Sequence, residues 1–250
     1  MVGMGGLEFN ITILFFMLLV AVAFLYASVG HGGASGYIAL MSLFSFPIIF
    51  IKPAALVLNI FISGISFWFF KKQKHFKWSL FYPFALTSIP AAFLGGYLDV
   101  NTVLYRQVLG VLLLLATLRI LGFFGRENKT KRPLKKSLAL IFGLGIGFFS
   151  GMIGIGGGIV LSPLLLLLGW ADLKESAAVS ALFILVNSSA GLLGYTSSHS
   201  LGIDHFYLVP IALIGGVLGA KYGSGSFPNY ILRYTLSVVL IIACVKLTFL

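Results

Sequence analysis

The sequence predicts an all-α, polytopic integral membrane bundle made of two homologous halves. Of its 250 residues, 59% are hydrophobic and only 9% are charged, whereas soluble domains carry roughly 25% charged residues. So few charges cannot cover a water-facing surface. The apolar stretches, such as ITILFFMLLVAVAFLYA, are continuous rather than alternating, which favours membrane helices over the strands of a barrel.

Candidate membrane segments follow one another along almost the whole chain. In order they are 9–29, 34–51, 53–70, 79–98, 102–121, 137–153, 157–169, 176–196, 205–223 and 228–249. Most approach the ~20 residues that a helix needs to cross the hydrocarbon. The segment 157–169 is too short to cross alone, and 34–51 contains Gly36 and Pro47. We therefore expect eight to ten hydrophobic segments, with either of these two able to be re-entrant.

A glycine-rich stretch occurs once in each half of the chain. LYASVGHGGASGYIAL begins at Leu25 and FSGMIGIGGGIVLSPL begins at Phe149, and their glycines fall at matching positions. Such self-similarity indicates duplication. We predict a first transmembrane repeat over 1–124, a basic cytoplasmic linker over 125–136 and a second transmembrane repeat over 137–250.

The net charge of +11 is concentrated in two basic loops, KKQKHFK at 71–77 and GRENKTKRPLKK at 125–136. The positive-inside rule places both loops in the cytoplasm. Inverted halves would put Lys174, Lys221 and Arg233 on that same side, whereas parallel halves would put them outside, so the rule favours inversion. The charge excess suits orientation and contact with anionic membrane lipid, or attraction of an anionic substrate. Nucleic acid is not an expected partner, because the basic residues lie in short loops.

The two glycine stretches predict helices that break inside the membrane. Backbone groups freed at such depth need partners, so breaks occur only inside protein or beside a watery cavity. The helix that restarts after a break presents N–H groups and a partial positive charge, which suit an anion. Two such starts could face one midplane site. The open alternative is that glycine serves only close helix packing.

The candidate substrate-binding residues lie at these breaks and on the polar helices that follow them. They are His31, Gly32, Gly33, Ala34, Ser35, Asn59, Gly156, Gly157, Gly158, Ile159, Ser180 and Asn187. Asn59, Ser180 and Asn187 offer neutral donors for an oxyanion, or they hydrogen-bond between helices. His31 could bind the anion, carry a proton with it, or satisfy loop carbonyls as a neutral imidazole.

Several classes of protein are disfavoured by what the sequence lacks. All six acidic residues lie near segment ends or in loops, which argues against cation transport and carboxylate proton relays. No phosphate-cradling GxxxxGK[ST] and no zinc-type motif occurs, so no cofactor or metal is expected. GASG at 33–36 resembles the nucleophile motif of rhomboid intramembrane proteases, with Ser35 as the nucleophile. The accompanying alanine–histidine pair is missing, so we do not expect an enzyme.

The paired motifs VGHGGASGYIAL and IGIGGGIVLSPLLL resemble the TauE/SafE family of sulfite and organosulfonate exporters, which includes 4-toluene sulfonate uptake permease-like transporters. The resemblance covers nearly the whole chain. His31 before the paired glycines and Ala34 for the third glycine depart from the family pattern. The resemblance implies export of a small sulfur-containing anion, such as sulfite, sulfoacetate or thiosulfate, across the cytoplasmic membrane of a prokaryote.

From these features we expect alternating access around an anion held at the helix breaks. The alternative is a proton-coupled carrier of another small organic anion, and the protease reading is a remote one. Rows of small residues, at 143, 147 and 151 and at 215 and 219, indicate close helix contacts. The second row fits packing within one chain or between two, which leaves a homodimer open.

Overall fold

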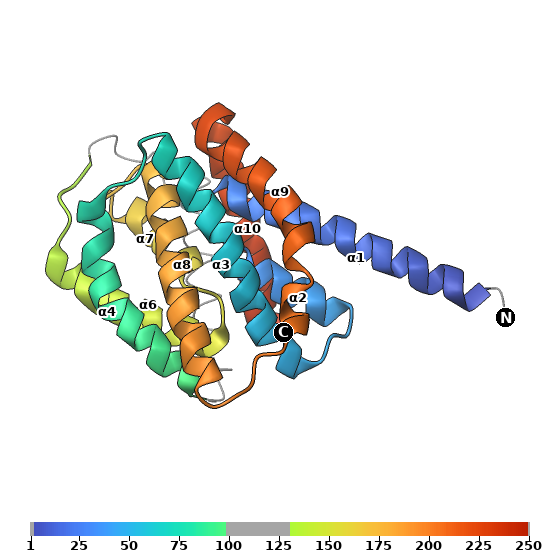
Figure 1. The fold of residues 1–250 in the computed structure, drawn as a ribbon. Helices are drawn as coiled ribbons and strands as arrows, with labels where there is room; N and C mark the ends of the chain where they lie inside the picture. The colour runs from blue at the N-terminus through green and yellow to red at the C-terminus, as the bar shows by residue number, and fades with distance from the viewer. Residues whose placement is uncertain (1–2, 99–130, 250) are drawn as a thin grey trace.

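A computed structural model of the chain describes residues 3–98 and 131–249 (Figure 1). Every regular element within these ranges is helical, and six of the helical segments are long and apolar enough to cross a membrane. The predicted all-α membrane class is therefore confirmed. The expected segment 102–121 and most of the linker 125–136 lie outside the described residues.

The described helices follow a recurring order of long helix, break, short helix and long helices. They are α1 (Gly3–Ser28), α2 (Ala34–Leu43), α3 (Ile48–Lys72), α4 (Trp78–Tyr97), α6 (Lys136–Ile153), α7 (Gly158–Leu167), α8 (Leu173–Thr196), α9 (Val209–Lys221) and α10 (Asn229–Phe249). A 3-10 turn, η1 (Ile203–Phe206), precedes α9, and a π-helical turn, η2 (Tyr222–Ser226), follows it. The short helices α2 and α7 each come directly after a glycine stretch.

The predicted segment 34–51 is wrong, because the chain turns in its middle. Helix α2 ends at Leu43, Ser45 adopts a left-handed φ of 57°, and Pro47 immediately precedes α3. Proline has no N–H to continue a helix and suits the start of the next one. Residues 48–51 consequently form the first turn of α3, and α2 is too short to span a bilayer.

Helices α3 and α8 form an antiparallel pair at the centre of the bundle (Figure 1). Near the start of α3, the ammonium of Lys52 lies 5.5 Å from the ring centroid of Tyr195, at the end of α8. Farther along, Asn59 Nδ2 donates to Ser188 Oγ. Near the end of α3, Phe70 packs against Ala178, close to the start of α8. These three contacts fix the opposite directions of the two helices.

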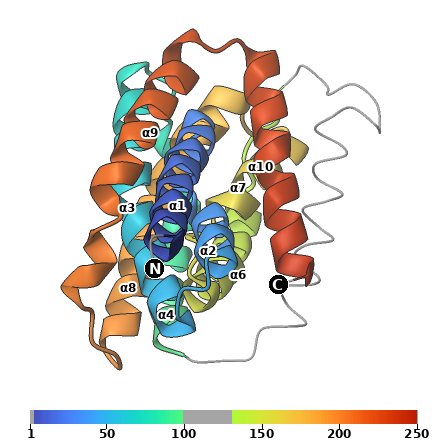
Figure 2. The same ribbon diagram turned by 90° about the vertical axis from the view of Figure 1, so that its right-hand side faces the viewer.

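The glycine rows pack within the chain, each against a neighbouring helix. Helix α9, which carries one of the rows, lies beside α1 (Figure 2). A Cβ at any of these glycines would collide with a backbone carbonyl of the opposite helix. Along α6, Gly143, Gly147 and Gly151 face Phe84, Ser88 and Ala92 of α4; after α9 begins, Gly215, Gly219 and Gly223 face Val20, Phe24 and Ser28 of α1. Small residues let helix backbones approach this closely. Packing within one chain therefore accounts for Gly215 and Gly219.

We expect Gly147→Ala to lower the free energy of unfolding by roughly 1–3 kcal/mol, the usual cost of overpacking. The added methyl would overlap the Ser88 carbonyl oxygen and lie 2.8 Å from its carbon. Gly145→Ala is the matched control, because a Cβ there meets nothing within 4 Å. Because alanine has the higher helix propensity, Gly145→Ala should raise the free energy of unfolding by about 1 kcal/mol relative to the wild type. Thermal unfolding in detergent checks this, and equal effects of the two variants would contradict the packing.

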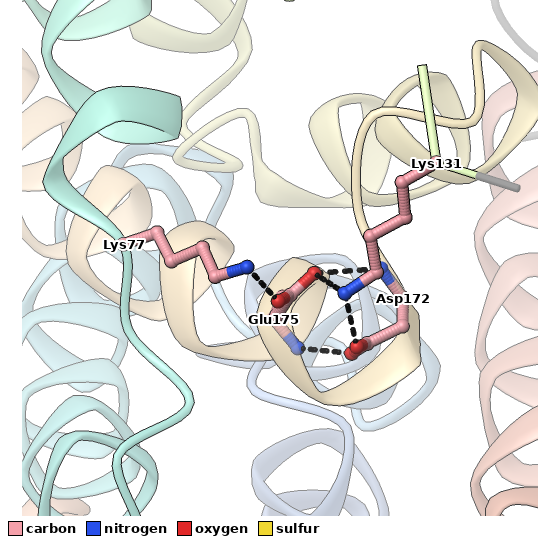
Figure 3. A network of polar contacts seen from close by, with 4 residues as sticks. All are labelled: Lys77, Lys131, Asp172 and Glu175. Atoms are coloured by element: carbon pink, nitrogen blue, oxygen red, sulfur yellow. Dashed lines mark hydrogen bonds and ion pairs between the residues drawn. The ribbon is translucent and has the colours of Figure 1, made fainter. Parts of the chain in front are cut away.

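An ion network at the start of α8 joins three separate segments (Figure 3). Glu175 is buried and binds Lys77, at the start of α4, and Lys131, in the linker before α6. Asp172 caps α8 and also binds Lys131. Burial opposes ionisation of Asp172, but hydrogen bonds from the Glu175 backbone and Lys131 outweigh it, so the pKa of Asp172 lies below its usual value.

The loop at 71–77 and the start of α8 also contact η2 at this end of the bundle. His75 Nε2 lies 3.1 Å from the Ser224 carbonyl, and Lys174 Nζ lies 3.4 Å from the Gly225 carbonyl. The loop at 71–77, the linker, the start of α8 and η2 therefore meet at one end, which we call the basic end. Lys52 lies at the opposite end, beside Tyr195.

We expect Glu175→Gln to reduce the free energy of unfolding by about 2 kcal/mol, as typical for hydrogen bonds to charged groups. The substitution leaves the ammonium groups of Lys77 and Lys131 without their buried carboxylate. Asp172→Asn is the matched control, because asparagine still caps a helix while it loses only the more exposed ion pair. A chemical-denaturation or thermal assay in detergent compares them. Equal destabilisation would show that burial of Glu175 adds nothing.

Candidate functional site

Both glycine stretches interrupt helices, and glycine is required there by backbone geometry. The first break lies between α1, which ends at Ser28, and α2; the second lies between α6, which ends at Ile153, and α7. Left-handed φ angles occur at Gly30 (75°), Gly33 (99°), Gly154 (83°), Gly156 (71°) and Gly157 (77°). Residues with a Cβ rarely adopt this conformation. Gly33 and Gly157 are the residues from which α2 and α7 start.

The two breaks meet at Asn59 of α3 and at Ile184 and Ser188 of α8. A Cβ at Gly156 would lie 2.6 Å from Ser188 Oγ, 2.8 Å from Asn59 Nδ2 and 2.9 Å from Ile184 Cγ2. A Cβ at Gly32 would overlap Asn59 Oδ1 and lie 3.0 Å from the same Ile184 methyl. We call residues 29–33 and 154–157, together with Asn59, Ile184 and Ser188, the junction.

Asn59 bridges the first break and the helix of the other half. Its Oδ1 accepts a hydrogen bond of 2.9 Å from the backbone N–H of Ala34, the first residue of α2. Its Nδ2 donates to Ser188 Oγ at 3.2 Å. The N–H groups of the first helical turn have no intrahelical partner and carry the positive end of the helix dipole. The carboxamide oxygen thus occupies a position that suits an oxygen of a bound anion.

His31 links the two breaks directly. Its Nε2 lies 3.1 Å from the carbonyl oxygen of Gly158, the first residue of α7, and its Nδ1 lies 3.1 Å from the carbonyl oxygen of Val29. The side chain is completely buried. The repeat position in the second break is Ile155, so the two breaks differ chemically here.

The structure brings most of the predicted residues together, but three bond away from the junction. Those at or next to the junction are His31, Gly32, Gly33, Ala34, Asn59, Gly156, Gly157, Gly158 and Ile159. Ser35 pairs with the Tyr26 hydroxyl at 2.7 Å, and Ser180 pairs with Ser162 Oγ at 2.7 Å. Asn187 donates from Nδ2 to the Phe183 carbonyl of its own helix at 2.8 Å.

Ile184 and Ser188 are junction side chains that are not among the candidate residues. They are four residues apart and so share one face of α8. Asn187 lies one residue before Ser188 and therefore about 100° around the helix from it. Ser180 and Asn187, seven residues apart, lie within about 20° of each other around the helix, so spacing alone favours Asn187 over Ser188.

The junction is closed, and none of its described residues is a carboxylate. The side chains of His31, Asn59, Ser188 and Ile184 are at most 2% exposed. Within residues 3–98 and 131–249, no group of three or more metal-ligating side chains occurs. In this part of the chain the carboxylates of Asp172 and Glu175 are held by lysines at the basic end. The polar side chains of the junction carry amide, hydroxyl and imidazole groups.

Residues 14–247 match the family model described as "Sulfite exporter TauE/SafE". The chain belongs to the TauE/SafE family. Similar proteins include a "probable membrane transporter protein" of Sinorhizobium fredii, 37% identical over 90% of this chain and 94% of that protein. Another probable membrane transporter protein, of Methanocaldococcus jannaschii, is 27% identical over 72% of each chain.

A protein of Arabidopsis thaliana named "Sulfite exporter TauE/SafE family protein 1" is 32% identical over 51% of this chain and 28% of its own length. No solved structure matches the chain. The TauE/SafE chain described here is a multi-pass membrane protein of a transporter family and not an enzyme. Membership of a transporter family argues against the hypothesis that Ser35 is a protease nucleophile. The hydroxyl of Ser35 is hydrogen-bonded to a tyrosine and not to a histidine.

Proposed function

We propose that this protein exports a small sulfur-containing anion across the cytoplasmic membrane and binds it at the junction. The observation that carries the proposal is that both helix breaks meet at one buried position, where α2 and α7 start. Two helix starts aimed at one place concentrate partial positive charge without any fixed cation. Amides and hydroxyls hold an anion weakly enough to release it, as transport requires.

We propose further that the two repeats are inverted and exchange access by rocking against each other. The antiparallel contacts of α3 and α8 support inversion, because these helices hold matching places in the two repeats. Burial of the whole junction supports an occluded state between the two open ones. A small recess lined by Val29, Ser162 and Ser176 lies between the first break and the start of α8, which suits a path from the basic end.

The direction of transport follows from charge. The positive-inside rule assigns the basic end to the cytoplasm, where lysines raise the local concentration of anions. An anion then leaves the negative interior with a gain of about 2.3 kcal/mol per charge for each 100 mV. Export therefore needs no ATP, and a dianion that leaves with one proton still moves one net negative charge down the potential.

A flux screen in proteoliposomes tests the proposal. Purified protein is reconstituted, and efflux of sulfite, thiosulfate, sulfoacetate and sulfate is compared with efflux of glycerol, a neutral solute. We expect saturable efflux of at least one sulfur anion that rises with an inside-negative potential. Efflux of glycerol with none of the four anions transported would overturn the proposal.

A further inference from the structure

The ring of His31 is placed between two carbonyl oxygens at equal distances of 3.1 Å, one on each nitrogen. One carbonyl, of Val29, belongs to the first break, and the other, of Gly158, belongs to α7. Both are acceptors. Each nitrogen of the ring therefore faces a hydrogen-bond acceptor, and neither faces a donor.

A neutral imidazole has one N–H and one lone pair, whereas an imidazolium has two N–H donors. In either neutral tautomer, one nitrogen directs its lone pair at a carbonyl oxygen and that contact is not a hydrogen bond. The protonated ring satisfies both carbonyls and ties the two breaks together with charge-assisted bonds. The geometry thus fits the protonated form better than the neutral one.

A positive charge buried at this place needs a negative partner. Around the junction, the described titratable side chains are Tyr26 on α1, Tyr37 on α2 and Lys52 on α3. The described residues that face it from the second half are Ile146 and Ser150 of α6, Gly158 of α7, and Phe183, Ile184 and Ser188 of α8, and none of these is acidic. Only the aliphatic part of Lys52 lies beside Gly154, and its ammonium lies beside Tyr195 at the opposite end from the basic end. None of the described junction residues can balance an imidazolium, whereas an anion bound there can.

We propose that His31 takes up one proton when an anion binds at the junction, so that each anion leaves with a proton. This inference rests on the proposed function and names its coupling ion. The proton comes from water on the loading side, bonds to the ring nitrogen that lacks one, and returns to water on the release side. A monoanion would then cross without net charge, and a dianion would carry one net negative charge.

Linkage makes the coupling measurable. If one proton binds with each anion, the dissociation constant of the anion rises about tenfold for each unit of pH, over the range in which only the complex is protonated. Thiosulfate is a suitable probe, because its own charge does not change in the neutral range. A pH effect on its binding therefore reports on the protein.

Isothermal titration of the full-length protein in detergent with thiosulfate tests the proposal. Repeating it at pH 7 in buffers of different ionisation enthalpy gives the number of protons taken up per anion. We expect close to one proton for the wild type and none for His31→Gln. His205→Gln is the matched control, because His205 lies in η1 and stacks on Phe50, away from the junction; it should keep the wild-type count.

The outcomes separate the two proposals. Thiosulfate binding by the wild type with no proton uptake would overturn the role of His31 and leave anion transport intact. Proton uptake that persists in His31→Gln would overturn it as well. If none of the four sulfur anions is transported in the flux screen, the proposed function is wrong, and this inference is wrong with it. If the Gln variant does not bind thiosulfate, the wild type alone tests the coupling: close to one proton per anion supports it, and no proton uptake overturns it.

Discussion

Gly156→Ala should reduce anion flux by about 100-fold or more, which is the loss typical when a site is displaced by about 1 Å. The added methyl would lie 2.6 Å from Ser188 Oγ and 2.8 Å from Asn59 Nδ2, so it would occupy the space between the breaks. Alanine at a φ of 71° also costs about 1–2 kcal/mol. Initial rates of thiosulfate efflux from proteoliposomes measure the effect.

Gly169→Ala separates the two causes. Gly169 has a similar φ of 67°, but a Cβ there would meet only the side chain of Arg132 at 3.8 Å. This variant should lose about the same stability through backbone strain and keep its flux. Equal loss of flux in both variants would mean that strain, and not the junction, explains the effect of Gly156.

Asn59→Asp should weaken anion binding by about three orders of magnitude. Aspartate has the same shape and can still accept from the Ala34 N–H, but it loses the donor to Ser188 and brings a negative charge into the junction. Two like charges about 4 Å apart repel by about 4 kcal/mol at an effective dielectric constant of 20. Titration with thiosulfate at pH 8 measures the dissociation constant.

Asn229→Asp is the matched control for Asn59→Asp. It makes the same substitution at the exposed first residue of α10, outside the junction, and should leave thiosulfate binding unchanged. Monodisperse elution of both variants shows that they fold. Stronger binding of a cation to the Asn59 variant, with thiosulfate binding intact, would point to a cation site instead.

The helix breaks could be predicted from the sequence because their cause is local. Glycines that need a positive φ, such as Gly33 and Gly157, mark their positions without any knowledge of neighbours. The end of α2 is harder to predict for a related reason: Gly36 and Pro47 resemble interruptions of one apolar segment, whereas Pro47 caps the start of the next helix. Apolar composition continues through this turn and hides it.

The partners of polar side chains could not be predicted, because they depend on how helices are rotated in the bundle. Spacing placed Ser180 and Asn187 on polar faces of α8, but not which face meets the breaks. Packing against α3 turned Ser188 toward Asn59. Asn187 instead bonds to its own helix. Asn59 is the one amide of α3, and it lies at the junction.

Locating the anion is the most direct test of the site. Selenite resembles sulfite and scatters X-rays anomalously, so a crystal of the protein soaked at a concentration that saturates flux reveals its position. We predict an anomalous peak at the junction, within hydrogen-bond distance of the Ala34 N–H, with the carboxamide of Asn59 displaced from it. A peak elsewhere in the bundle, with the junction unchanged, would contradict the account.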